Sequence, residues 1–137
     1  MVALGCLLRA HPHVVTTAWI VMLAGCGGFV GEAFINRRAT LTAHVLTADG
    51  RVGVPCKVTA LLFGDEYAQA EVNAGNNAEV AVGMLTPAKA PQPVTARVAL
   101  RVDCQGYAVV TTPERETAVA AVGVPVVEFG TVAVRVK

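Results

Sequence analysis

VTARVALRV, residues 94–102, is the stretch of sequence that decides the fold. Every second residue of it is apolar, and Arg97 and Arg101 occupy two of the positions between. A period of two places alternate side chains on opposite faces of an extended strand. We therefore predict a half-buried β-strand with the arginines facing out. The side chains predicted to face in are Val94, Ala96, Val98, Leu100 and Val102.

Alternation of the same kind continues on both sides of this stretch. Residues 39–47 (ATLTAHVLT) show it clearly, and the Asp49-Gly50 pair that follows is a turn signal. Residues 86–93 contain three prolines and are predicted to form a loop, because proline cannot donate to a strand ladder. Further strands are predicted over residues 57–63, 67–72, 78–82, 107–112 and 126–136.

Three segments carry a likeness to a known family. Residues 45–63 read VLTADGRVGVPCKVTALLF, residues 104–112 read CQGYAVVTT, and residues 126–136 read VVEFGTVAVRV. They resemble the opening hairpin, the Gly-Tyr strand and the closing strand of transthyretin-like, carboxypeptidase-regulatory-like domains. The resemblance implies a sandwich used for folding, anchoring or protein contact. The expected fold is thus all-β, an antiparallel β-sandwich of about seven strands, transthyretin-like or immunoglobulin-like.

The first 25 residues have the layout of an export signal, which we expect to be helical. Positive charge at Met1 and Arg9 precedes an apolar core over residues 14–22. The next four residues are Leu23, Ala24, Gly25 and Cys26. This tetrapeptide resembles the bacterial lipobox. The resemblance implies that a diacylglycerol carrying chains such as palmitate is transferred to the Cys26 thiol, and that the chain is cleaved just before it.

A spanning or buried helix is the alternative interpretation of this segment. A spanning helix needs about 20 apolar residues, whereas glycine at positions 25, 27 and 28 interrupts the apolar run. The removable signal fits better. Because Gly27 rather than Asp follows the cysteine, the sorting rule of enteric bacteria implies the outer membrane rather than the inner one. The predicted organisation is a signal peptide over 1–25, a lipidated tether over 26–38 and a β-sandwich over 39–137.

The four cysteines divide into separate roles. Cys6 leaves with the signal and Cys26 is lipidated, so Cys56 and Cys104 remain. In an oxidising envelope such a pair forms a disulfide worth about 2–4 kcal/mol, with two separate thiols as the alternative. A metal site would add His44, but from Cys26 onward the sequence has no CxxC or HxH spacing, and we expect neither a metal nor another cofactor.

Composition excludes several classes of function. From Cys26 onward ten Lys and Arg balance ten Asp and Glu, so a nucleic-acid partner is not expected. The chain contains no serine, which excludes serine nucleophiles. The pair Arg37-Arg38 is expected to be exposed rather than to form a phosphate site, with contact to anionic head groups near a membrane as the alternative. The acidic residues of 65–66 and 114–116 are expected to be solvated loop charges rather than a catalytic pair.

These observations lead to one principal hypothesis about function. We expect a non-catalytic envelope lipoprotein, held on a membrane by its lipid, whose sandwich contacts another envelope protein or has a structural role. The alternative is a module that binds a small molecule or glycan at the cell envelope. No catalytic residues are assigned, and an enzyme is the least favoured class.

Overall fold

The computed structural model describes residues 32–137, and this part of the chain is all-β. It holds eight strands and no helix, and therefore no helix long and apolar enough to cross a membrane. The predicted signal segment lies outside the described residues. The strands are β1 (Phe34–Thr47), β2 (Pro55–Leu62), β3 (Asp65–Asn73), β4 (Asn77–Pro87), β5 (Val94–Cys104), β6 (Val110–Thr111), β7 (Arg115–Val119) and β8 (Val126–Val134).

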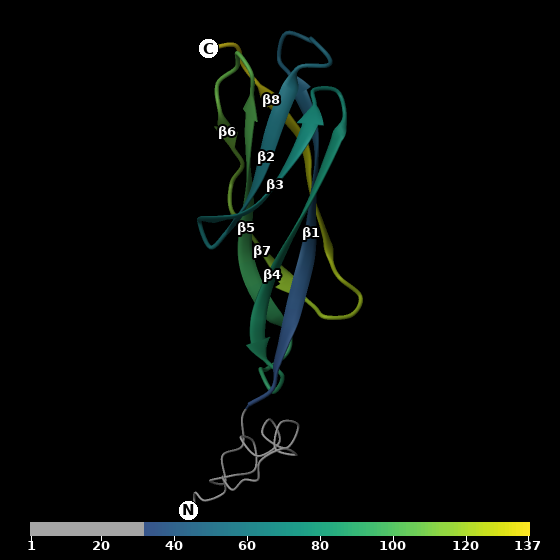
Figure 1. Ribbon diagram of the computed structural model, residues 1–137, viewed down its shortest axis with the longest axis vertical. Coiled ribbons are helices and arrows are strands. Elements are labelled where there is room, and N and C mark those ends of the chain that lie inside the picture. The colour runs from purple at the N-terminus through teal and green to yellow at the C-terminus, as the bar shows by residue number, and fades with distance from the viewer. Residues whose placement is uncertain (1–31) are drawn as a thin grey trace, which may run out of the picture. The chain divides into compact units, whose positions relative to one another are not determined.

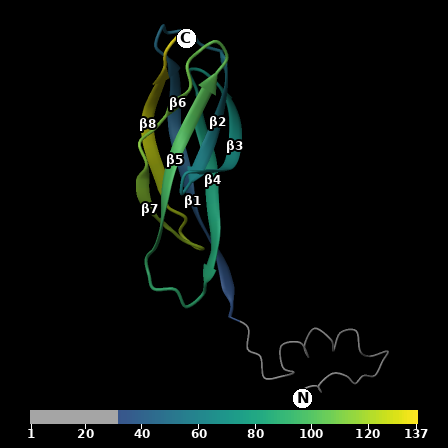
Figure 2. The same ribbon diagram turned by 90° about the vertical axis from the view of Figure 1, so that its left-hand side faces the viewer.

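The strands form two sheets, consistent with the predicted β-sandwich (Figures 1 and 2). Sheet A has the order β4-β1-β8, and sheet B has the order β3-β2-β5-β6. The short β7 also pairs with β5, below β6 on the same edge: β6 pairs with Arg101 and Val102, and β7 pairs with residues 94–98. The eight strands therefore occupy seven strand positions.

One pairing differs from the antiparallel arrangement that we predicted. β8 runs parallel to β1, with Thr40 opposite Val126 and Thr47 opposite Val134, while the other pairings between strands are antiparallel. The reason lies in the connection. After β7 the chain passes from sheet B to sheet A, where Ala120 exchanges two backbone hydrogen bonds with Arg38 of β1. It thus reaches sheet A at the end where β1 starts, and can only continue in the direction of β1.

The core lies between the sheets and is built from the alternation seen in the sequence. In β1 the odd-numbered residues from Ala39 to Val45 are buried, and their even-numbered neighbours are partly exposed. In β5 the residues predicted to face in are buried, except for the partly buried Val94 at its start. The largest fully buried apolar side chains are Leu41, Val45, Val58, Val82, Val98, Leu100, Val102 and Val134.

The strand boundaries differ from prediction at three places. β1 begins at Phe34, so five residues assigned to the tether belong to the sandwich, where they pair with β4. β4 continues to Pro87 instead of ending at residue 82, and only the last two of the three prolines lie in the loop. Between residues 107 and 112 only Val110–Thr111 form a strand.

β7 was not predicted, because its two charges in five residues leave too little apolar alternation. β7 lies at the edge of sheet B, where a strand needs only one neighbour. Its backbone hydrogen bonds to β5 are therefore enough to hold it as a strand without an apolar face. β5 is consequently paired on both sides. β8 is an edge strand that pairs along one side with β1, and just beyond it Val136 forms an isolated bridge with Tyr107.

Candidate functional site

The predicted lipobox, Leu23 to Cys26, lies outside the described residues. The predicted disulfide is confirmed: Cys56 and Cys104 are bonded, with their Cα atoms 3.9 Å apart. They face each other across β2 and β5, two neighbouring strands of sheet B. The bond therefore reinforces one sheet instead of joining the two sheets, and both residues belong to the buried core.

Tyr107 connects two of the segments that carry the family resemblance. Its side chain is buried, and its hydroxyl donates to the carboxylate of Asp49, lying 2.9 Å from both oxygens. Desolvation raises the pKa of Asp49, but the hydrogen bond from Tyr107 and others within the turn together hold it below the usual value. The Asp49-Gly50 turn after β1 is thus fixed to the Gly-Tyr segment after β5.

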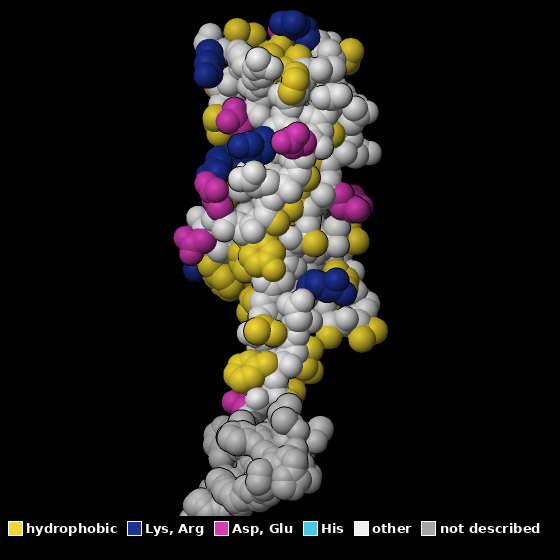
Figure 3. Space-filling model, viewed as in Figure 1, with side chains coloured by type: hydrophobic (Ala, Val, Ile, Leu, Met, Phe, Trp, Pro, Cys, Tyr) yellow, Lys and Arg dark blue, Asp and Glu magenta, His cyan; other side chains and the backbone are white. Residues whose placement is uncertain are grey.

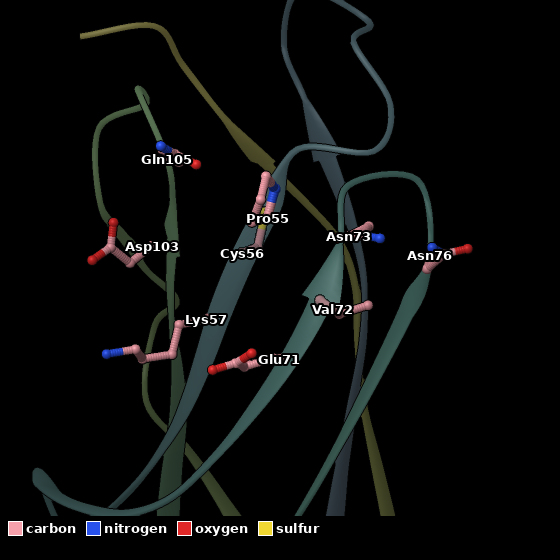
Figure 4. Close-up of a pocket in the computed structure, with 9 residues that line it drawn as sticks. All are labelled: Pro55, Cys56, Lys57, Glu71, Val72, Asn73, Asn76, Asp103 and Gln105. Carbon is pink, nitrogen blue, oxygen red and sulfur yellow. The ribbon is translucent and has the colours of Figure 1, made fainter.

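A shallow groove lies on the outer face of sheet B. We call it the Lys57 groove. It has a volume of about 580 Å³. Figure 4 shows Lys57 lying between Glu71 and Asp103. The groove is lined by Pro55, Cys56, Lys57, Glu71, Val72, Asn73, Asn76, Asp103 and Gln105.

The strand register explains this row of charges. Lys57 is opposite Glu71 on β3 and opposite Asp103 on β5, so one cation has a carboxylate on each neighbouring strand. All three side chains are exposed, and Lys57 has no carboxylate within 4.0 Å among residues 32–137. The ammonium and carboxylate groups are therefore available to a ligand. Such a groove suits a polar ligand with both donors and acceptors.

His44 lies in a second depression, of about 490 Å³, on the outer face of sheet A. Its Nδ1 donates to Asn77 Oδ1 at 2.7 Å. Two residues before His44 on β1, Thr42 is opposite Glu79 on β4 and opposite Glu128 on β8. Residues 32–137 nevertheless contain no group of three or more His, Cys, Asp or Glu side chains arranged to hold a metal ion.

The prediction that the acidic residues of 65–66 and 114–116 are loop charges is wrong for three of the four, because Asp65 and Glu66 begin β3 and Glu116 lies in β7. Two of them, Glu66 and Glu114, pair with arginines of sheet B. Glu66 pairs with Arg101 across the outer face. Glu114 lies 3.9 Å from Arg97, an exposed pair. These contacts keep the carboxylates on the surface of the sheet and form no cleft between them. Pairs of this exposure contribute about 0–1 kcal/mol each to stability.

The Arg37-Arg38 pair is not exposed as a whole, which corrects the prediction. Arg38 faces solvent, but Arg37 is 7% exposed and points into the sandwich, in phase with Ala39. Its Nε donates to Thr86 Oγ1 at 2.7 Å. When the side-chain amide of Gln92 is oriented with its oxygen toward Arg37, both terminal nitrogens of the guanidinium donate to that oxygen at 3.1 Å. Arg37 thus has neutral acceptors and no carboxylate partner within the described residues.

Sequence reasoning missed the Lys57 groove and the burial of Arg37 for different reasons. The groove depends on the register of three strands, which no local pattern records. The burial of Arg37 was indicated in the sequence. Odd-numbered residues of 39–47 face inward, and continuing this alternation two residues toward the N-terminus places Arg37 on the inward face. Comparison with known proteins adds no further assignment, since no family model, no curated protein and no solved structure matches this chain.

Proposed function

We propose that this chain is a non-catalytic lipoprotein of the bacterial cell envelope, anchored through Cys26, whose sandwich acts as a protein-contact or structural module. The observation that carries the proposal is the closeness of the lipobox to a folded β domain. β1 begins at Phe34, eight residues after Cys26, and eight residues span at most about 29 Å. An acylated Cys26 would hold the domain at the bilayer surface, with the outer membrane as the favoured location.

We also propose that the domain is of the transthyretin-like, carboxypeptidase-regulatory-like class. Two findings support this. The eight strands fill seven positions in two sheets, as a seven-stranded sandwich requires. The Asp-Gly turn and the Gly-Tyr segment, which carry the resemblance, meet through the hydrogen bond between Asp49 and Tyr107. In this class the domain stabilises or contacts other proteins.

Metabolic labelling with an alkyne-tagged palmitate in a bacterial host tests the anchor. We expect the wild type to take up the label, lose its first 25 residues and partition into detergent. Cys26→Ala should remain unlabelled and uncleaved, because the thiol is the acyl acceptor. Cys6→Ala is the matched control, since it removes the other cysteine of the segment, and it should behave as the wild type does. An unlabelled wild type, or normal cleavage of Cys26→Ala, would refute the proposal.

The second candidate function is the binding of a small polar molecule or glycan, and the Lys57 groove is the observation that favours it. Ligand-observed NMR with a panel of neutral and amino sugars tests this candidate. Lys57→Met should abolish any signal of binding, whereas the matched control Lys137→Met, at the carboxyl end of the described chain, should leave it unchanged. Equal binding by both variants would exclude the groove.

A further inference from the structure

The end of the domain where β1 starts exposes two apolar side chains, and an exposed tyrosine lies over Gly83 of β4, which is opposite Arg38, four residues farther along β1. Leu85 is 70% exposed, Phe34 57% and Tyr67 51%. Leu85 on β4 is opposite Asn36 on β1, which makes it a diagonal neighbour of Phe34 on the outer face of sheet A. Figure 3 shows hydrophobic side chains gathered over this end of β1 and β4.

A glycine brings the basic and aromatic groups of this surface together. A Cβ on Gly83 would lie 3.1 Å from Arg38 Cγ and 3.4 Å from Tyr67 Oη, so both side chains lie over the bare backbone of β4. The Arg38 side chain and the Tyr67 hydroxyl therefore approach the same glycine, although they come from different sheets. We call Phe34, Arg38, Tyr67, Leu85 and Lys89 the Phe34 patch.

The charge of this end is positive. Residues 34–38 and 83–93 contain Arg37, Arg38 and Lys89 and no acidic residue. Arg37 is buried and has no carboxylate within 4.0 Å among the described residues, so no ion pair offsets its charge. Glu32 is exposed just before β1. Asp65 and Glu66 precede Tyr67 on β3, and Glu66 pairs with Arg101.

We propose that the Phe34 patch docks on the anionic head groups of the bilayer, an inference that rests on the proposed lipid anchor. Apolar side chains, an amphipathic tyrosine and basic side chains together fit the water–lipid boundary. The connection from Cys26 keeps Phe34 within about 29 Å of the acylated sulfur. The tether therefore keeps the patch close to the membrane surface, and the attraction between its basic side chains and the anionic head groups favours the docked orientation.

The opposite end of the domain is a natural control. It also exposes apolar side chains, Val52 and Val136, and it carries the cations Arg135 and Lys137. β1 is 14 residues long, so at about 3.3 Å per residue this end lies roughly 45 Å from Phe34, where the connection to Cys26 enters the domain. Both ends of the domain therefore expose apolar and basic side chains, but only the Phe34 end adjoins the connection to Cys26.

Lysine footprinting of the lipidated full-length chain in vesicles tests the proposal, because the chain has only three lysines: Lys57, Lys89 and Lys137. A water-soluble acetylating ester is applied at low conversion to protein in phosphatidylcholine vesicles with or without phosphatidylglycerol. Each basic residue near an anionic membrane surface raises the affinity of the protein for that surface about fivefold. We therefore expect phosphatidylglycerol to slow acetylation of Lys89 at least about fivefold relative to Lys137, and added salt to reverse the effect.

Variants separate docking from general adhesion. Arg38→Glu and Leu85→Ser should each restore fast acetylation of Lys89, whereas the matched controls Arg135→Glu and Val136→Ser should not. Equal rates at Lys89 in both kinds of vesicle would overturn the proposal, as would restoration by the controls. Protection that requires an envelope protein and not phosphatidylglycerol would assign the patch to a protein partner instead.

The intact mass of the same samples reports acylation separately. A chain without acyl mass would refute the lipid anchor. If that chain, mixed with phosphatidylglycerol vesicles, also shows no protection of Lys89, the docking proposal fails on its own account; protection would uphold it independently of the anchor.

Discussion

Breaking the bond between Cys56 and Cys104 should cost the domain a large part of its stability. The two residues are 48 positions apart in the sequence. Closing a loop of that length lowers the entropy of the unfolded chain enough to stabilise the fold by about 4 kcal/mol at 25 °C in the chain-entropy description. A domain of this size has a total free energy of unfolding of about 5–15 kcal/mol.

The perturbation is best made in two ways. Reduction of the wild type removes the bond and keeps both sulfur atoms, whereas the double variant Cys56→Ala/Cys104→Ala also removes some core packing. Urea unfolding followed by circular dichroism should give a free energy of unfolding about 4 kcal/mol lower after reduction, and somewhat lower still for the variant. A loss below about 1 kcal/mol on reduction would refute the reasoning, because the loop constraint would then contribute little.

Two further predictions concern the turn and the core. The folded-state pKa of Asp49 is depressed, so the stability it contributes is present above its unfolded value of 3.8 and is lost as the pH falls through the folded value. Tyr107→Phe should weaken this acid dependence in unfolding curves measured between pH 5 and pH 2, since the hydroxyl that favours the carboxylate is gone, and an unchanged acid dependence would contradict the assignment. Leu100→Ala should lower the free energy of unfolding by about 2–5 kcal/mol, because the side chain is fully buried. The matched control Leu85→Ala, at an exposed position, should change it by at most about 0.5 kcal/mol, and equal losses would show that burial does not set the cost.

The sequence predicts this fold best where one face of a strand is buried. In residues 94–102 the alternation determines strand, face and core residues together, and the structure agrees. The disulfide followed from counting cysteines, yet its position within one sheet required the pairing of β2 with β5. The start of β1 was placed too late because Phe34 is exposed and Arg37 is charged, so neither matched an apolar-in, polar-out pattern.

Long-range features were beyond local patterns. The parallel pairing of β1 with β8 joins segments about a whole domain apart in the chain, and nothing in residues 126–136 states the direction of the partner. The Lys57 groove likewise appears only when Glu71 and Asp103 are brought to either side of Lys57. For the Phe34 patch the alternation of β1 indicates which arginine faces solvent, but not that Tyr67 of the other sheet lies over Gly83.

The parallel pairing of the first and last strands has a mechanical consequence. Tension applied between the start of β1 and the end of β8 acts along both strands, because these points lie at opposite ends of the pair. The ladder from Thr40–Val126 to Thr47–Val134 is then loaded in shear, and its hydrogen bonds share the force instead of opening one after another. A domain held at the foot of β1 and pulled from the far end of β8 would resist that pull with its whole central ladder.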